Sequence, residues 1–145
     1  MQEVSFEEAL AEIQAKDPRY QREAYLFVRE ALDHTQKTIA KDTRGRVRHV
    51  TGQELLAGAR DLALQQFGPM AKTLLEEWGI RCCADFGEIV FNMIEVGWLA
   101  KTKTDSRGDF ESGYDFDEVF VKPFLPKARL AKAESAPALP PGHKL

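Results

Sequence analysis

The chain has 145 residues, of which 43% are hydrophobic and 30% are charged, and 20 Lys and Arg residues stand against 23 Asp and Glu residues for a formal net charge of −3. This length and composition predict one domain with its own core and exclude a wholly disordered chain. The near balance of charge excludes a polycation that binds nucleic acid through its overall charge, because such affinity comes from neutralising many phosphates at once.

The first forty residues contain the signals of two helices. Ser5 and Glu8 form a capping-box pattern, and apolar residues follow at helical spacing, so a helix is expected over residues 6–16. Asp17 and Pro18 suit the N-cap and the first position of a second helix, because proline has the backbone angle of a first helical residue. This second helix is expected to extend toward Lys41.

A third helix is expected after a polar connector over residues 41–49. Thr51 and Glu54 form a second capping-box pattern, and Val50 and Leu55 are placed to pack against each other as a hydrophobic staple. Apolar residues continue at helical spacing up to the Gly-Pro pair at 68–69, which is expected to end the helix.

Two more helices are expected after the third, from the same kinds of capping and spacing signals. The fourth is expected to begin at Pro69 and to end at Gly79, since glycine readily adopts the left-handed conformation that closes many helices. The fifth is expected to be capped by Asp85, with Glu88 completing the pattern, and to continue to Gly97 with a largely buried apolar face.

The segment after the fifth helix has two interpretations. Residues 98–104 are rich in β-forming residues and residues 105–109 in turn residues, which predicts a β-hairpin within 98–120. Asp115 followed by Glu118 instead favours a short helix within residues 114–121, and we prefer the helix for that part. The predicted fold is therefore mainly α, with about five helices and a small C-terminal hairpin or irregular subdomain that could be winged-helix-like.

The end of the chain is expected to be a flexible tail. Residues 126–145 are rich in proline and alanine and contain few large apolar side chains, so ordering them would cost backbone entropy without burial in return. We therefore place a single helical domain at residues 1–125 and the tail at 126–145.

The two cysteines, Cys82 and Cys83, are adjacent and cannot staple distant segments together. We expect both cysteines to be buried as small hydrophobic side chains before the fifth helix. The alternative is that they act as a redox or metal-binding pair. The cysteines and the three scattered histidines lack the paired spacing of a zinc site, so no metal or cofactor is expected.

The location of the protein is inferred from two further features of the chain. The first residues lack a basic region followed by an apolar stretch of signal-peptide length, and no apolar run approaches the ~20 residues that a spanning helix needs. A cytoplasmic protein without a membrane span is expected.

A concentrated basic segment covers the end of the second expected helix and the connector that follows it. It contains Lys37, Lys41, Arg44, Arg46, Arg48 and His49. These residues could bind phosphate or an acidic protein surface, and the alternative is a solvated loop. His49 precedes a helix N-terminus, which would keep its imidazole neutral and suited to general-base work beside an acid such as Glu54 or Asp61. No nucleophile can be assigned to it.

The third to fifth helices followed by a hairpin have the order of a winged-helix unit, in which the last helix enters the major groove. Lys101, Lys103 and Arg107 could then touch the nucleic-acid backbone from the turn, on the same face as the basic segment. The fifth helix argues against DNA, because its polar positions include Glu88 and Glu95 and it contains no Lys or Arg.

Aromatic residues near the expected hairpin are candidate anchors for a protein partner. They are Trp98, Tyr114 and Phe116, and packing into the chain's own core is the alternative. The preferred function is thus that of a small non-catalytic interaction or regulatory protein with a protein partner. Winged-helix-type nucleic-acid binding is the second hypothesis, an enzyme using His49 is the third, and association with a second copy is left open.

Several motifs resemble those of a conserved bacterial family of unknown function, restricted to the planctomycete and verrucomicrobial lineages. Among them are Asp17-Pro18-Arg19-Tyr20, His49-Val50-Thr51-Gly52-Gln53-Glu54-Leu55-Leu56, Gln66-Phe67-Gly68-Pro69-Met70-Ala71 and Asp85-Phe86-Gly87-Glu88-Ile89. The similarity extends from residue 5 to about residue 125. It implies a single small cytoplasmic domain, and it transfers no activity, cofactor or site residue.

Overall fold

All regular structure in the described part of the chain is helical. The computed structural model describes residues 6–42, 50–99, 108–111 and 113–126. Its α-helices are α1 (Phe6–Lys16), α2 (Arg22–Asp42), α3 (Gly52–Phe67), α4 (Ala71–Glu77), α5 (Cys83–Glu95), α6 (Gly108–Glu111) and α7 (Phe116–Phe120), with 3-10 turns η1 (Gly68–Met70) and η2 (Lys122–Phe124). The mainly α fold class is therefore confirmed.

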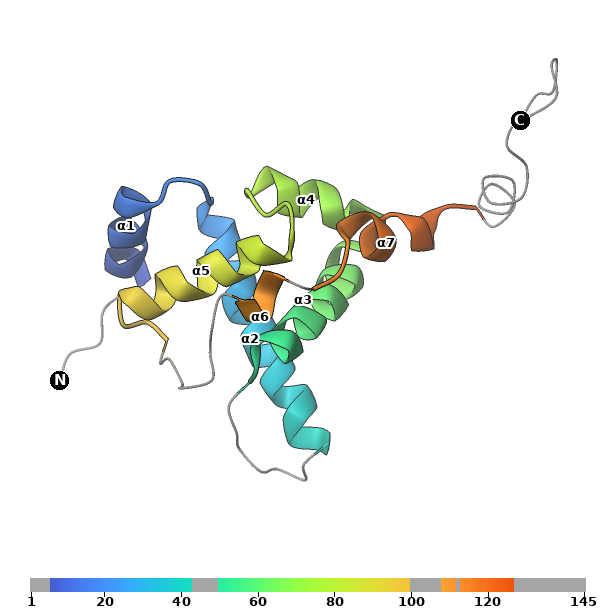
Figure 1. Cartoon of the computed structure of the whole chain (residues 1–145), viewed down its shortest axis with the longest axis horizontal. Coiled ribbons are helices and arrows are strands. Elements are labelled where there is room, and N and C mark those ends of the chain that lie inside the picture. The colour runs from blue at the N-terminus through green and yellow to red at the C-terminus, as the bar shows by residue number, and fades with distance from the viewer. Residues whose placement is uncertain (1–5, 43–49, 100–107, 112, 127–145) are drawn as a thin grey trace, which may run out of the picture.

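The helices are arranged around the long pair α2 and α3, which pack against each other (Figure 1). Helix α5 lies across this pair, α1 lies beside α5, and α4 lies next to α7. The short helix α6 is held between α3 and α5. The core contains large side chains from several of these elements, among them Tyr25 of α2, Leu56 of α3, Leu75 of α4, Phe86 of α5 and Phe120 of α7, each less than 2% exposed.

The start of α3 is the best example of a correctly predicted boundary. The Thr51 hydroxyl oxygen accepts a hydrogen bond from the Glu54 backbone N–H at 3.1 Å. In return, the Glu54 carboxylate accepts one from the Thr51 backbone N–H at 3.0 Å. Both free N–H groups are satisfied reciprocally, as a capping box requires. The helix ends where Gly68 takes a φ of 53°, a conformation that is cheap only for glycine.

The predicted start of the second helix at Pro18 is wrong, because α2 begins at Arg22. The Asp17 carboxylate does not cap α2. It accepts hydrogen bonds from the Arg19 side chain at 2.7 Å and from the Asn92 side chain of α5 at 3.0 Å. The chain then turns, and the Gln21 backbone N–H donates to the carbonyl of Trp78 at 3.0 Å.

The predicted cap of the fifth helix is also wrong, because α5 begins at Cys83 and Asp85 lies within its first turn. The Asp85 carboxylate instead contacts groups that precede the first residue of α5. It accepts hydrogen bonds from the backbone N–H groups of Arg81 at 2.8 Å and Cys82 at 3.3 Å, and from the Tyr20 hydroxyl at 2.6 Å. This carboxylate therefore satisfies helix-terminal donors and ties α5 to the α1–α2 corner.

The structure corrects the expected hairpin and the winged-helix arrangement that depended on it. The described part of residues 98–120 contains no strand, and it forms the helices α6 and α7 instead. Asp115 caps α7 by accepting from the backbone N–H groups of Asp117 at 2.8 Å and Glu118 at 3.2 Å, as the helical interpretation predicted. Phe116 and Phe120, four residues apart, are both buried on one helical face. The expected turn and tail lie mostly outside the described residues.

None of the described helices has both the length and the apolar character needed to cross a bilayer.

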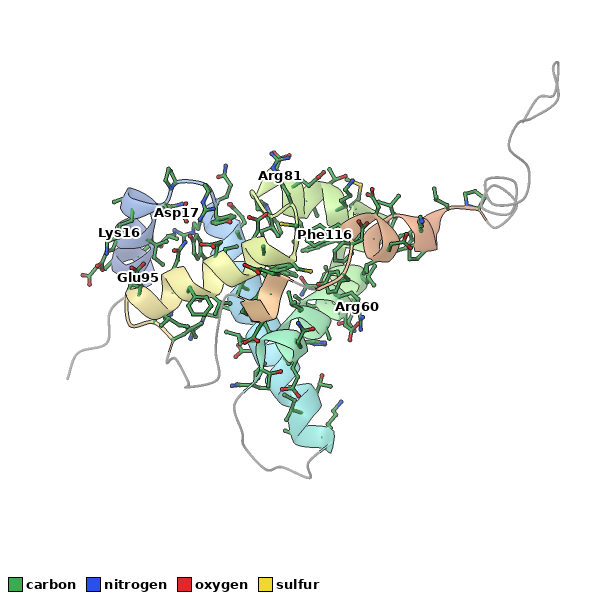
Figure 2. The ribbon with its side chains drawn as sticks, in the orientation of Figure 1. Lys16, Asp17, Arg60, Arg81, Glu95 and Phe116 are labelled. Carbon is green, nitrogen blue, oxygen red and sulfur yellow. The ribbon has the colours of Figure 1, made fainter. Side chains whose placement is uncertain are left out.

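A polar network connects the α1–α2 corner to α5. Figure 2 shows Asp17 at this corner, and the Asn92 amide that donates to it also donates to the Tyr25 hydroxyl at 3.1 Å. Hydrogen bonds from the Arg19 side chain lower the pKa of Asp17 well below its usual range, although partial burial acts in the opposite direction. Folding therefore favours the ionised carboxylate.

This network should make stability sensitive to acid. The unfolded chain binds a proton at Asp17 at about pH 4, whereas the folded chain binds it only at lower pH. The contribution of Asp17 to stability is therefore complete above about pH 4 and is lost progressively as the pH falls from there toward the lower pKa of the folded chain. We expect Asp17→Asn to be less stable than wild type at neutral pH, and the difference to narrow below about pH 4. Urea unfolding followed by circular dichroism at several pH values measures this.

The matched control is Asp61→Asn, which removes an exposed carboxylate on α3 that pairs with Arg60. Surface pairs of this kind contribute little, so this variant should track wild type closely at every pH. A stability difference between Asp17→Asn and wild type that stays constant between neutral and acidic pH would contradict the linkage.

Candidate functional site

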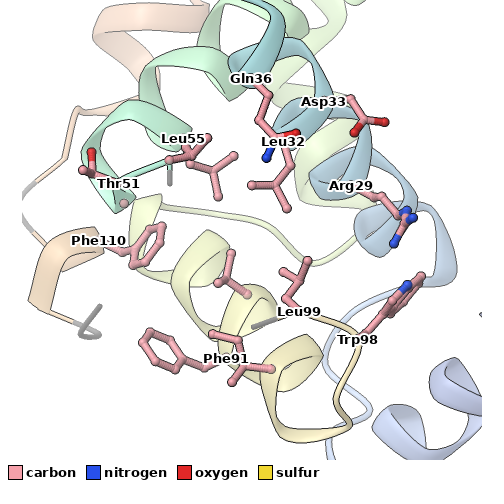
Figure 3. Close-up of a pocket in the computed structure, with 14 residues that line it drawn as sticks. Arg29, Leu32, Asp33, Gln36, Thr51, Leu55, Phe91, Trp98, Leu99 and Phe110 are labelled. Atoms are coloured by element: carbon pink, nitrogen blue, oxygen red, sulfur yellow. The ribbon is translucent and has the colours of Figure 1, made fainter. Parts of the chain in front are cut away.

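A cavity of about 360 Å³ lies among α2, the start of α3, α5, the residues that follow α5, and α6 (Figure 3). Its lining is mostly apolar, with a few polar side chains. The lining residues are Arg29, Leu32, Asp33, Gln36, Val50, Thr51, Gly52, Leu55, Val90, Phe91, Ile94, Trp98, Leu99 and Phe110. This volume falls in the lower part of the range typical of ligand pockets, which are also predominantly apolar with a few polar groups.

Helical spacing explains how α2 and α3 supply one wall. Arg29, Leu32, Asp33 and Gln36 recur at three- and four-residue intervals, so they share one face of α2. Leu55 of α3 is only 3% exposed and lies near Leu32 in Figure 3. The capping box at the start of α3 fixes where this wall begins.

The opposite wall comes from α5 and the residues after it. Val90, Phe91 and Ile94 belong to α5, and Trp98 and Leu99 follow its end. Gly97 has a φ of 79°, and the Trp98 and Leu99 backbone N–H groups both donate to the carbonyl of Met93. This turn brings Trp98 and Leu99 back toward α2, where Figure 3 shows Trp98 beside Arg29.

Two glycines allow α6 to close one end of the cavity. A Cβ atom on Gly87 of α5 would lie 2.8 Å from the Phe110 Cβ, and one on Gly52 of α3 would lie 2.9 Å from the Asp109 Cβ. Neither helix could approach α6 so closely with a larger residue there. Phe110 is consequently buried, 3% exposed, and its ring meets that of Phe91 edge to face at 6.5 Å.

The polar side chains of the cavity lie along the α2 wall. The Arg29 guanidinium stands over the Trp98 ring, 5.4 Å from its centroid, in a cation–π contact. Within the described ranges, the side chains of Arg29, Asp33 and Gln36 make no hydrogen bond or ion pair. Hydrogen-bond donors from Arg29 and Gln36 and acceptors from Asp33 are thus available at the edge of an apolar cavity.

Only one of the candidate interaction residues named from the sequence lies in the described part of the chain. Trp98 lines the cavity and is half-buried. The others lie outside the described residues: Arg44, Arg46, Arg48, His49, Lys101, Lys103 and Arg107. The expectation that the two basic groups share one face therefore stays a prediction. The chain neighbours of these segments, Val50 after the first and Leu99 before the second, both line the cavity.

The other two aromatic residues considered as anchors pack into the core. Phe116 is 5% exposed and contacts the rings of Phe86 and Phe120. The Tyr114 hydroxyl donates a hydrogen bond to the carbonyl of Leu56 at 2.8 Å, and burial raises the pKa of Tyr114. Phe116 therefore belongs to the core, and the half-buried Tyr114 packs against it.

The two cysteines differ, contrary to the expectation that both are buried. Cys83 is buried at the start of α5, and Cys82 is exposed. The Cys83 sulfur accepts a hydrogen bond from the Tyr114 backbone N–H at 3.3 Å, and burial raises the pKa of Cys83, which favours the thiol. In the described part of the chain, no group of three or more His, Cys, Asp or Glu side chains is placed to hold a metal ion.

The residues proposed to act with His49 have other partners. Glu54 is committed to the capping box of α3, and the Asp61 carboxylate accepts a hydrogen bond from Arg60 at 3.1 Å. His49 itself lies outside the described residues, so its chemistry stays untested.

Sequence reasoning missed most of the cavity. Arg29 and Phe110 belong to none of the motifs identified in the sequence, and the helical spacing of apolar residues such as Leu32 and Val90 gives no sign that a space lies between their helices. The glycines at positions 52 and 87 were a signal that could have indicated the cavity wall, because glycine allows another segment of the chain to approach closely.

The chain matches no protein-family profile, no curated protein and no solved structure. The resemblance to the bacterial family therefore stays a prediction.

Proposed function

We propose that this chain is a small non-catalytic interaction protein of the cytoplasm, and that its cavity binds an apolar anchor side chain of a protein partner. The observation that carries the proposal is the cavity itself: nine of its fourteen lining residues are apolar or aromatic, and it is bounded by four helices. Burying an anchor residue in such a site is favourable in proportion to the apolar area removed from water.

The composition of the cavity resembles that of the centre of a protein interface. Trp and Arg are enriched at the residues that dominate interface energetics, and here Trp98 and Arg29 lie together at one side of the opening. Their contact also restrains two side chains that would otherwise lose conformational freedom on binding. The polar groups of Asp33 and Gln36 could then orient the bound segment.

Filling the cavity should abolish partner binding. Val90→Phe adds bulk to a half-buried residue on the α5 wall, whereas Val119→Phe makes the same change at a half-buried residue of α7 that does not line the cavity. Wild-type and variant proteins are immobilised and exposed to native lysate, with and without nuclease. We expect wild type and Val119→Phe to retain the same stoichiometric protein, and Val90→Phe to lose it by about tenfold or more.

A second cavity variant keeps the test valid if the first variant fails to fold. Leu99→Glu places a carboxylate on the lining just beyond α5, and circular dichroism shows whether each variant keeps the helical signal. Equal recovery of the partner by wild type and by both folded cavity variants would overturn the proposal. Salt-sensitive recovery of nucleic acid that nuclease removes, unaffected by Val90→Phe, would favour the nucleic-acid alternative instead.

A further inference from the structure

A stripe of four residues on the outer side of α2 runs beside the cavity, and we call it the α2 stripe. Its members are Leu26, Arg29, Asp33 and Gln36, and all four are exposed. The last three line the cavity, and Leu26 lies about two turns before Asp33 on the same side of the helix. Leu26 is 43% exposed and is one of three exposed large hydrophobic side chains in the part of the chain that the structure describes. The stripe thus presents an apolar side chain beside an apolar cavity.

The two charges of the α2 stripe are not paired with each other. Arg29 and Asp33 are four residues apart, a spacing at which opposite charges on one helix commonly form an ion pair. Here Arg29 is turned toward the Trp98 ring and away from Asp33 (Figure 3). Across the described ranges, neither side chain makes a hydrogen bond or ion pair. One positive and one negative charge are therefore available at the edge of the cavity.

The spacing of the α2 stripe is symmetric along the helix. Its residues follow one another at intervals of three, four and three, which is the same spacing in both chain directions. Two copies of α2 packed antiparallel about a two-fold axis at the level of residue 31 would place Arg29 of each copy opposite Asp33 of the other. The same axis would place Leu26 of each copy opposite Gln36 of the other, at the edge of the cavity. The stripe is therefore complementary to a second copy of itself.

From this self-complementarity we infer that the partner of the cavity is a second copy of this chain. Two chains form a symmetric dimer through α2, in which Leu26 of each copy enters the cavity of the other and two Arg29–Asp33 ion pairs flank the contact. The inference rests on the proposed function and names its partner. Such an interface uses the same surface on both subunits, so every favourable contact occurs twice.

Charge favours this register of the two helices over its neighbours. An axis at the level of residue 33 would place Asp33 opposite itself and Arg29 opposite Lys37. An axis at the level of residue 29 would place Arg29 opposite itself. Like charges held side by side at an interface are unfavourable. Of these three arrangements, the axis at residue 31 is the one that joins opposite charges.

Charge reversal tests the pairing, by sedimentation equilibrium of the full-length chain at low salt. We expect wild type to dimerise with a micromolar dissociation constant. Arg29→Asp and Asp33→Arg should each weaken dimerisation at least about tenfold, because each replaces two attractive contacts by two repulsive ones. The two variants carry opposite charges on the α2 stripe, so an equimolar mixture of them should form a mixed dimer. The double variant that carries both changes should also dimerise.

Leu26→Ala tests the anchor. Phe124→Ala is the matched control, because Phe124 is a large apolar side chain of nearly equal exposure, 44%, and belongs to η2. Leu26→Ala should weaken the dimer about tenfold, and Phe124→Ala should leave it unchanged. Val90→Phe, which fills the cavity, should have the same effect as Leu26→Ala, and circular dichroism shows whether each variant keeps the helical signal.

The outcomes separate this inference from the proposed function. A chain that stays monomeric at every concentration would overturn the inference. The proposed function would then stand if the cavity recovers a different protein from native lysate, and it would also fall if no protein is recovered. A dimer that does not respond to the charge reversals, or that responds to neither Leu26→Ala nor Val90→Phe, would have its interface elsewhere and would overturn the inference.

Discussion

Phe86→Ala is expected to lower the free energy of unfolding by about 3–5 kcal/mol, the usual cost of removing a fully buried phenylalanine. Phe86 of α5 is 1% exposed, and its ring lies 6.3 Å from that of Phe27 on α2 and 6.1 Å from that of Phe116 next to the cap of α7. The substitution would leave a cavity at the point where three helices meet. Since domains of this size are stable by only about 5–15 kcal/mol, the variant should unfold at much lower urea concentration.

Phe124→Ala is the matched control. Phe124 is 44% exposed in η2, so the same change in side chain should alter the free energy of unfolding by no more than about 0.5 kcal/mol. Both variants are compared with wild type by urea unfolding followed by far-ultraviolet circular dichroism. A cost of less than about 1 kcal/mol for Phe86→Ala would mean that α2, α5 and α7 do not share the core described above.

The features that were predicted correctly depend on residues close together in sequence. The capping box of Thr51 and Glu54 and the cap of α7 by Asp115 are satisfied within three residues. The bounds of α1, residues 6–16, also agree with the local pattern. Local hydrogen bonds and helical spacing are visible in a single sequence because both partners lie within one turn.

The incorrect boundaries have long-range causes. Asp17 and Asp85 both have the local context of helix caps, but each carboxylate is shared with a distant partner. Asp17 accepts from Asn92, 75 residues away, and Asp85 accepts from Tyr20, 65 residues away, while it also accepts from the Cys82 backbone at the start of α5. Nothing in the local sequence distinguishes a carboxylate that caps its own helix from one that ties two helices together. The start of α2 and the start of α5 could therefore not be inferred without the tertiary structure.

The cavity could not be predicted from the sequence for a related reason. Leu32 and Val90 follow the same three- and four-residue spacing as fully buried neighbours, and their half-buried state depends on how far α2 and α5 are held apart. Because a hairpin was expected in this region, α6 was not predicted, although its Phe110 closes one end of the cavity. Periodicity shows which face of a helix is apolar, but it does not show whether another side chain covers that face.

A tight contact between α2 and α3, at Thr35 and Gly58, provides the second large expected effect. In a helix interior, Gly→Ala ordinarily stabilises a protein by up to about 1 kcal/mol. At Gly58 of α3 the sign should reverse, because the added Cβ would overlap the hydroxyl oxygen of Thr35 on α2. Thr35 is buried, and its hydroxyl donates a hydrogen bond to the Ala31 carbonyl at 2.7 Å, so it has little room to move. We expect Gly58→Ala to cost about 1–3 kcal/mol in urea unfolding.

A double-mutant cycle separates this contact from any other effect of the methyl group. Thr35→Ala removes the obstructing hydroxyl and leaves the residue-35 Cβ, which lies 3.0 Å from the position of the added Cβ and needs only a small shift. In the Thr35→Ala background, Gly58→Ala should therefore change the free energy of unfolding by no more than about 0.5 kcal/mol. If Gly58→Ala costs the same with Thr35 present or absent, the two helices do not meet at these residues, and the α2–α3 pair that forms one wall of the cavity would have a different register.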